Sequence, residues 1–318
     1  MNRAAELLGV TVPIVQAPIG SATTAELAAA VSNAGGLGTL AGTWRSPDAL
    51  RKIIHHTQAL TTRPFGVNLV LAFDTAELLE IILAAGVRVV SFSWGDPAPW
   101  IPVVHRTGGI VVHSVGNAVD AKAAVDAGAD LLVAQGREAG GHVQGTTPLA
   151  ELLAEMKGGV SVPVLAAGGI GDVNAARRAL ALGADGLWLG TRFLASRESS
   201  AHPDYKQAIL EAGSADTMLG VVFTIGWADA PHRVIRNSTV RAWESSGRQH
   251  GGRPGEGDVV ARFEDGKPVV RYEDVIPVEG MTGELESLAL YAGESVGSIT
   301  EILPAATIVE QMSAAFRT

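Results

Sequence analysis

One histidine lies in a glycine-rich segment directly after an apolar run, a composition suited to binding a ligand. Gln135 directly follows the run, and Gly140, Gly141 and His142 come next. Histidine titrates near neutral pH, so His142 can serve as a general base or as a hydrogen-bond donor to an anionic substrate. The alternative is a loop histidine that only satisfies a backbone carbonyl.

Two later segments have the character of a phosphate site. Gly168 and Gly169 follow one apolar run, and Gly190 and Thr191 follow the next. Glycines let backbone N–H groups approach an anion, and a helix start adds attraction for phosphate. Either pair alone is also explained by a tight turn. Together, in this order, they predict phosphate binding, although they do not distinguish a flavin from a sugar phosphate.

Small and polar residues near two earlier runs extend this site. Asn68 interrupts an apolar strand end, and its carboxamide can bind the polar edge of a flavin ring. A capping role is the alternative. Ala17 and Pro18 follow the first run and place small backbone against a cofactor's face. Trp94 and Trp100 are expected to cover the mouth of the site.

Several other chemistries are excluded or disfavoured by what the sequence lacks. There is no cysteine, which excludes disulfides, thiolate metal sites and cysteine nucleophiles. The remaining histidines lack metal-ligand spacing, so we expect no metal site. No G-x-S-x-G elbow occurs. A phosphosugar aldolase or isomerase would require a lysine or a carboxylate pair at the strand ends, whereas these runs end in Gln, Asn, Gly and His.

Eight apolar runs alternate with helical stretches, which is the rhythm of a (β/α)8 barrel in the α/β class. The expected strands span 14–17, 38–40, 65–69, 89–92, 110–113, 131–134, 164–166 and 186–189. Amphipathic helices are expected at 24–33, 75–85, 119–127 and 174–182.

These helices end in a shared way, with Gly35, Gly86, Gly128 or Gly183 just before the next strand. A glycine there adopts the left-handed conformation without a Cβ penalty. A doubly wound open sheet would use the same units, and the number of strands favours the TIM barrel. Active sites of such barrels lie at the carboxyl ends of the strands, where the residues above are found.

We expect three parts along the chain. Residues 1–198 form the barrel core that binds the cofactor, and residues 199–303 form a smaller, mainly helical or irregular subdomain. A mobile surface loop is expected at 245–257, where glycine and arginine are frequent. Residues 304–318 form a C-terminal helix that packs back on the barrel.

A net charge of −9 argues against nucleic-acid and anionic-membrane partners, since both favour a basic surface. The first 15 residues offer neither a signal-peptide core nor an apolar stretch long enough to span a membrane. We therefore expect a cytoplasmic enzyme acting on a small molecule. Whether it is a monomer or a homodimer is left open.

Six motifs together resemble those of the nitronate monooxygenases, formerly called 2-nitropropane dioxygenases. They are PIVQAP at 13–18, GGLG at 35–38, FGVN at 65–68, EAGGH at 138–142, AGGI at 167–170 and LGTRF at 189–193. Segments 233–237 and 292–297 are similar to the family's post-barrel segments, so the resemblance covers essentially the whole chain.

The resemblance implies non-covalent FMN, with its phosphate at Gly168, Gly169, Gly190 and Thr191. It also implies contacts of the ring with Ala17, Pro18, Asn68 and Gln135, and His142 as the active-site histidine. Such enzymes oxidise alkyl nitronates or nitroalkanes with O2 to a carbonyl compound and nitrite.

One position departs from the family pattern. Some members carry a lysine after the fifth strand that helps to hold the phosphate, where this chain has Ser114, which can donate a hydrogen bond to the cofactor but carries no charge. Arg192 or backbone amides are therefore expected to neutralise more of the phosphate charge. His113 is a secondary site candidate, with a buried structural role as the alternative.

Two other functions remain open. The FMN- and NADH-dependent enoyl-acyl-carrier-protein reductase shares the fold and the Glu-x-Gly-Gly-His loop, and the sequence separates the two poorly. A catalytically silent FMN-binding protein is the lesser alternative.

Overall fold

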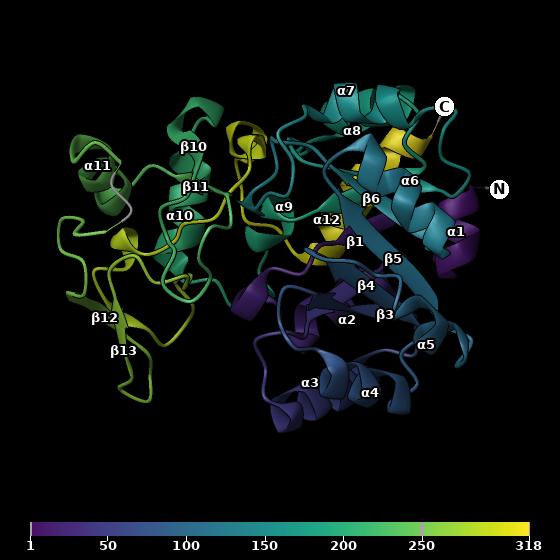
Figure 1. The fold of residues 1–318 in the computed structure, drawn as a ribbon, viewed down its shortest axis with the longest axis horizontal. Helices are drawn as coiled ribbons and strands as arrows, with labels where there is room; N and C mark the ends of the chain where they lie inside the picture. The colour runs from purple at the N-terminus through teal and green to yellow at the C-terminus, as the bar shows by residue number, and fades with distance from the viewer. Residues whose placement is uncertain (1, 249–250, 318) are drawn as a thin grey trace.

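A computed structural model describes residues 2–248 and 251–317 of the chain. Its larger part is an eight-stranded parallel sheet in the order β1-β9-β8-β6-β5-β4-β3-β2 (Figure 1). A parallel bridge between Val15 and Leu37 joins the first and last strands of this order, so the sheet closes into a barrel. The predicted fold class is confirmed. The strands are β1 (Ile14–Gln16), β2 (Gly38–Ala41), β3 (Phe65–Val70), β4 (Val89–Ser93), β5 (Ile110–Val115), β6 (Leu131–Gln135), β8 (Val164–Ala167) and β9 (Gly186–Leu189).

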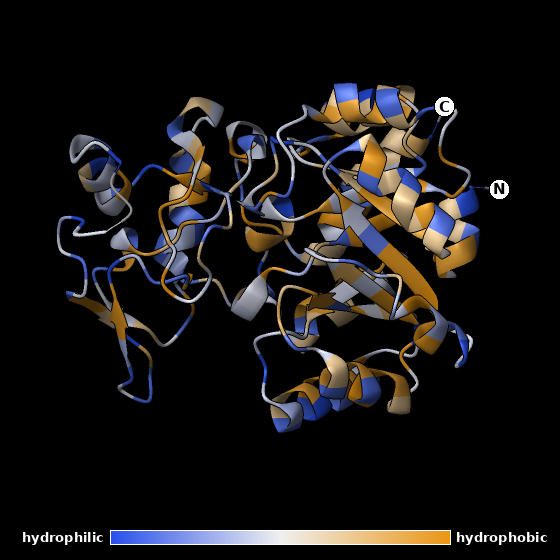
Figure 2. Cartoon of the chain, in the orientation of Figure 1, coloured by the Kyte–Doolittle hydropathy of each residue, from blue (hydrophilic) through white to orange (hydrophobic). Residues whose placement is uncertain are grey.

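Helices cover the outside of the barrel, and their apolar faces pack on the strands (Figure 2). The glycines expected after four of them adopt positive φ angles: 94° at Gly35, 75° at Gly86, 105° at Gly128 and 106° at Gly183. The helices are α2 (Ala25–Asn33), α3 (Pro47–Leu60), α4 (Ala76–Ala84), α5 (Ile101–His105), α6 (Ala118–Ala127), α7 (Leu149–Met156), α8 (Val173–Ala181) and the short α9 (Thr191–Leu194).

The amino-terminal end of the barrel is closed by α1 (Arg3–Leu8). Its Ala4 and Leu8 belong to the same buried cluster as Val15 and Leu165, whose strands build the barrel. Because α1 fills this end of the barrel, the cavity opens at the other end, where the carboxyl ends of the strands lie.

The C-terminal helix α12 (Ala305–Ser313) lies among the outer helices of the barrel, as its yellow colour in Figure 1 shows. It contacts α2, α8 and β1. Ile308, Val309 and Met312 are buried there, at the spacing expected for one face of a helix.

The segment after α9 builds a separate lobe, on the left in Figure 1, with its own apolar core. Its elements are α10 (Pro203–Glu211), β10 (Thr217–Gly220), β11 (His232–Ile235), α11 (Ser238–Ser245), β12 (Val259–Arg262), β13 (Pro268–Val270) and β14 (Thr282–Gly283). Short 3-10 helices complete the chain: η1 (Gly20–Ala22), η2 (Ser214–Asp216), η3 (Leu285–Ser287), η4 (Glu294–Ser298) and η5 (Ala314–Phe316).

Two small antiparallel sheets in this lobe were not foreseen. One has the order β13-β12-β14, and the other has the order β10-β11-β7. Strand β7 (Gly141–His142) belongs to the predicted site loop, so the barrel's histidine segment is hydrogen-bonded to the lobe. A two-residue strand shows no alternating pattern, which explains why the sequence did not reveal it.

The loop expected to be mobile at 245–257 is only partly described, because residues 249 and 250 lie outside the described residues. Within it, Arg253 is buried and donates to the Val222 carbonyl at 2.7 Å and to Glu256 at 2.7 Å. This end of the loop is therefore anchored. The division of the chain at residues 198 and 303 stays a prediction.

Among the described residues, every helix is too short or too polar to pass through a lipid bilayer.

Candidate functional site

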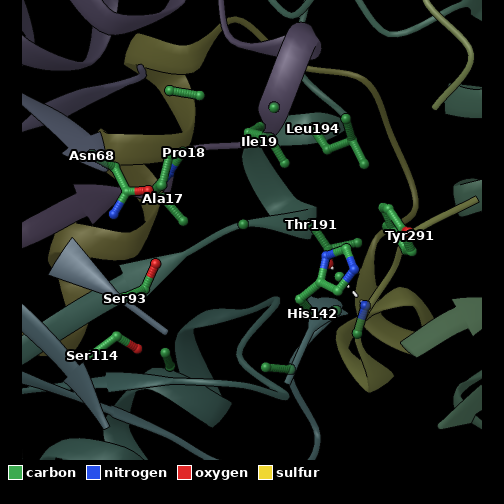
Figure 3. A pocket seen from close by; sticks show the side chains of 18 of the residues that line it. Ala17, Pro18, Ile19, Asn68, Ser93, Ser114, His142, Thr191, Leu194 and Tyr291 are labelled. Atoms are coloured by element: carbon green, nitrogen blue, oxygen red, sulfur yellow. Dashed lines mark hydrogen bonds between the residues drawn. The ribbon is translucent and has the colours of Figure 1, made fainter. Parts of the chain in front are cut away.

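A cavity of about 520 Å³ opens at the carboxyl ends of the barrel strands and is closed on one side by the appended lobe (Figure 3). The structure brings twelve of the sequence-predicted site residues to its lining: Ala17, Pro18, Asn68, Ser114, Gln135, Gly140, Gly141, His142, Gly168, Gly169, Gly190 and Thr191. Their individual roles stay predictions.

The glycines after β8 and β9 form one side of the cavity. Gly168 and Gly169 adopt φ angles of 113° and 68°, which favour glycine. Their amides, like those of Gly190 and Thr191, make no hydrogen bond within the described part of the chain. A Cβ added at Gly190 would meet only the Cβ of Ala17, 3.8 Å away. This side therefore offers unpaired N–H donors and open space beside them.

Asn68 and Ser114 line the cavity from β3 and β5 (Figure 3). The Asn68 amide nitrogen donates to the carbonyl and hydroxyl oxygens of Ser91, at 3.2 and 3.0 Å. Its carboxamide oxygen is left as an acceptor for a ligand.

Gln135 positions the histidine segment. Its amide nitrogen donates to the carbonyl of His142 at 3.0 Å, and its oxygen accepts from the amide of Gln144. Gly140 is needed where this segment crosses another, because a Cβ there would lie 2.3 Å from the backbone nitrogen of Gly293. The Gly293 amide in turn donates to the Thr191 hydroxyl at 3.0 Å.

The His142 ring is held between aromatic side chains. It stacks on Trp227 with ring centroids 4.2 Å apart, and Trp94 meets it edge-on at 6.1 Å. Its Nε2 is enclosed, lacks a hydrogen-bond partner among the described residues and lies 3.7 Å from the Asp274 carboxylate. Burial, with a smaller effect from His232, lowers the pKa of His142 to about 3, so the ring is neutral at pH 7.

Asp274 is itself buried and hydrogen-bonded. The Tyr291 hydroxyl donates to its Oδ1 at 2.6 Å, and both side chains line the cavity. Burial raises the pKa of Asp274 to about 6, the Tyr291 hydrogen bond opposes this shift, and Glu273 adds to it. Near neutral pH the carboxylate is thus mostly charged and faces an uncharged imidazole.

His232, one of the histidines that lack metal-ligand spacing in the sequence, is fully buried. Its Nδ1 lies 2.9 Å from the Ala230 carbonyl, and its Nε2 accepts from the amides of Val222 and Phe223. Both ring nitrogens are occupied in this way, so His232 is structural.

Sequence reasoning missed Asp274, Tyr291 and Trp227. All three come from the lobe and have no distinctive spacing in the sequence. Tyr291 offered the one signal, because it directly precedes the family-like segment 292–297.

Of the two expected ways to neutralise the phosphate charge, Arg192 or backbone amides, the structure favours the amides. Its guanidinium donates twice to the Glu301 carbonyl, at 3.1 and 3.0 Å, and is not part of the cavity lining. Since the side chain turns away from the cavity, the unpaired amides are the groups that remain for an anion.

His113 also lies outside the cavity lining, although its neighbours Val112 and Ser114 belong to it. Alternate residues of a strand point to opposite faces, so the His113 side chain faces the outer helices. It is buried, and burial lowers its pKa to about 4. The structural alternative holds for His113. Trp100, expected near the mouth, instead packs against the barrel core.

The chain matches one family model and is similar to several proteins of different names. A family model described as nitronate monooxygenase matches residues 2–78 and 72–314. The structure of FabK from Thermotoga maritima is 33% identical, with a TM-score of 0.86, and the match covers 100% of this chain and 96% of that one. The nitroalkane oxidase from Streptomyces ansochromogenes is 30% identical with a TM-score of 0.78, over 98% and 97% of the two chains.

A curated relative from Mycobacterium tuberculosis is 37% identical over 249 residues, covering 77% of this chain and 69% of the relative. That protein is named (3aS,4S,5R,7aS)-5-hydroxy-7a-methyl-1-oxo-octahydro-1H-indene-4-carboxyl-CoA dehydrogenase.

Proposed function

The chain belongs to the nitronate monooxygenase family of oxidoreductases, and we propose that it uses FMN to oxidise alkyl nitronates or nitroalkanes with O2, giving a carbonyl compound and nitrite. The observation that carries the proposal is the position of His142, a neutral and enclosed base that lines the same cavity as a set of unpaired backbone amides.

The residues present fit FMN. The free amides of Gly169, Gly190 and Thr191 suit a phosphate, because several N–H donors can share its charge where no cation reaches it. The unused oxygen of Asn68 suits a ring N–H of the flavin. Bound FMN supplies an electron acceptor, which the protein's own side chains lack.

His142 and Asp274 divide the proton chemistry in this proposal. His142 Nε2 faces Asp274, which leaves Nδ1 as the nitrogen that accepts the α-proton of a nitroalkane. The imidazolium that forms is then stabilised by the carboxylate, which Tyr291 holds in place. Trp94 and Trp227 keep water from the ring.

The test compares a neutral nitroalkane with its preformed nitronate, following O2 uptake and nitrite release. For His142→Ala we expect turnover of nitroethane to fall by about a hundredfold or more, because general-base catalysis contributes at least that much. Turnover of ethyl nitronate should fall less, since its proton is already gone. His55→Ala, an exposed histidine on α3, is the matched control.

Two results would reject the proposal. Absence of nitrite from both substrates would reject the activity, and equal losses for both substrates would reject His142 as the base in favour of an anchoring role.

A reductase that takes electrons from NADH is the second candidate. The overall similarity to FabK, with a TM-score of 0.86 over the whole chain, favours it. Rapid NADH oxidation in the presence of an enoyl thioester, without nitrite formation from nitronates, would support this candidate over the first. A catalytically silent flavin-binding protein would show neither activity.

A further inference from the structure

Four aromatic side chains, here called the aromatic wall, meet beside the cavity: Trp44, Phe73, Trp94 and Trp227. Ring centroids are 5.8 Å apart for Trp44 and Phe73, 5.2 Å for Phe73 and Trp227, and 4.9 Å for Trp94 and Trp227. The residues follow β2, β3 and β4 and, for Trp227, precede β11 of the lobe. Segments far apart in the sequence thus contribute to one apolar surface.

Two features distinguish the wall from ordinary core packing. Trp44 is 55% exposed although it lines the cavity. Trp94 adopts a φ of 59°, a left-handed conformation that is costly for a residue with a Cβ. Such strain tends to persist where a side chain must be held in a functional position. Both features indicate a surface prepared for a ligand.

The wall also has a defined place relative to the proposed chemistry. Trp227 stacks on His142, so the wall begins at the proposed base. In the closed barrel, at least two strands separate β3 and β4 from β8 and β9, which carry the unpaired glycine amides, and β1 separates β2 from β9. The wall is therefore distinct from the phosphate side and lies where substituents of a reacting carbon beside His142 would extend.

The charges around the cavity indicate what class of group the wall would hold. Among the described lining residues, Lys267 and Asp274 are the ones with formal charge at pH 7. Lys267 also borders a second hollow with Glu264, Asp265 and Glu279. A pyrophosphate, as in a pyridine nucleotide, would meet these carboxylates beside Lys267, the one cation among the described lining residues. An uncharged hydrocarbon group fits this lining better.

We propose that the aromatic wall is a subsite for the hydrocarbon body of the substrate, an alicyclic ring or an alkyl chain of several carbons attached to the reacting carbon. This inference rests on the proposed function for the identity of the reacting group. It predicts that larger substrates bind more tightly than ethyl compounds, which still react when they are supplied at saturating concentration.

Binding is measured separately from turnover, so that the two proposals can fail independently. The holoenzyme is titrated anaerobically with nitroethane, 1-nitrobutane, 1-nitrohexane and nitrocyclohexane, following quenching of tryptophan fluorescence. Each added methylene that is buried should tighten binding about threefold, so 1-nitrohexane, with four more methylenes, should bind about 80-fold more tightly than nitroethane.

Trp44→Ala should reduce this ratio about fivefold or more, because it removes the exposed end of the wall without touching His142. Leu182→Ala, which removes another exposed apolar side chain outside the cavity lining, is the matched control and should leave the ratio as it is. Equal affinities for nitroethane and 1-nitrohexane, or a ratio that Trp44→Ala does not change, would overturn the subsite. Tight binding of the longer compounds without any nitrite release would overturn the proposed function and retain the subsite.

Discussion

Replacing Asp274 by asparagine tests the pairing that the structure gives to His142. The substitution removes the carboxylate charge 3.7 Å from His142 Nε2. Asparagine keeps nearly the same shape and can still accept the hydrogen bond that Tyr291 now donates at 2.6 Å. The change is therefore close to a removal of charge alone.

The size of the effect follows from the distance. Two unit charges about 4 Å apart interact by about 4 kcal/mol at an effective dielectric constant of 20, which serves here as an upper limit. If about half of the imidazolium charge has formed in the transition state, Asp274 contributes about 2 kcal/mol, which corresponds to roughly a 30-fold change in rate. We expect kcat for nitroethane to fall by this factor, with a smaller change in KM.

The pH profile gives a readout that a merely structural role would not move. Asp274, with a pKa of about 6, is charged above that pH and neutral below it. Its stabilisation of the imidazolium is thus present above pH 6 and lost as the pH falls through 6. The wild type should show an acidic limb near pH 6, and Asp274→Asn should lack it. The pKa of His142, about 3, places its own protonation well below this range.

Asp274→Asn should make the folded protein more stable, although it lowers kcat. A carboxyl with a raised pKa binds its proton more tightly in the folded state, so folding loses stability as the pH rises from about 4 to 6. At pH 7.5, Asp274→Asn should therefore raise the free energy of unfolding, by on the order of 2 kcal/mol, and the Tm by a few degrees. Asp48→Asn, at an exposed position on α3, is the control for stability.

An Asp274→Asn variant with unchanged kcat and an intact acidic limb would refute the pairing of Asp274 with His142.

Two further predictions concern the close approach of Gly140 to Gly293 and the role of Arg192. Gly140→Ala should abolish flavin retention and nitroethane turnover, because its Cβ would lie 2.3 Å from the backbone of Gly293. Gly141→Ala has open space around its Cβ and should destabilise the fold by only about 1–2 kcal/mol, because of its positive φ. Equal losses of flavin content and Tm in the two variants would contradict the close approach of Gly140 to Gly293. Arg192→Lys should lower the Tm, because it loses the paired bond to the Glu301 carbonyl, and should leave the Kd for FMN within about threefold. A tenfold weaker FMN affinity would show instead that Arg192 does neutralise the phosphate.

Much of the barrel is predictable from the sequence because its signals are local. Glycines such as Gly35 and Gly128 mark where a helix ends and the next strand begins, and each adopts the expected left-handed backbone. The residues at the carboxyl ends of such strands must then meet at one end of the barrel. The gathering of Asn68, His142 and Gly190 at one cavity follows from this topology.

The lobe's contribution could not be predicted, because it depends on contacts between distant segments. Asp274 and Trp227 reach His142 only once β7 has paired with β11, and that pairing involves two residues of β7. The direction of the Arg192 side chain could not be predicted either. A cation next to a phosphate-like motif suggests a phosphate ligand, but the first turn of α9 directs this one to Glu301.

The most direct test of the account is anaerobic mixing of the purified, flavin-containing protein with either ethyl nitronate or NADH, following absorbance of the flavin. We expect a yellow protein whose flavin is bleached rapidly by the nitronate and recovers its colour on admission of O2, with nitrite formed. Rapid bleaching by NADH but not by the nitronate, or a colourless protein that takes up no FMN, would contradict it.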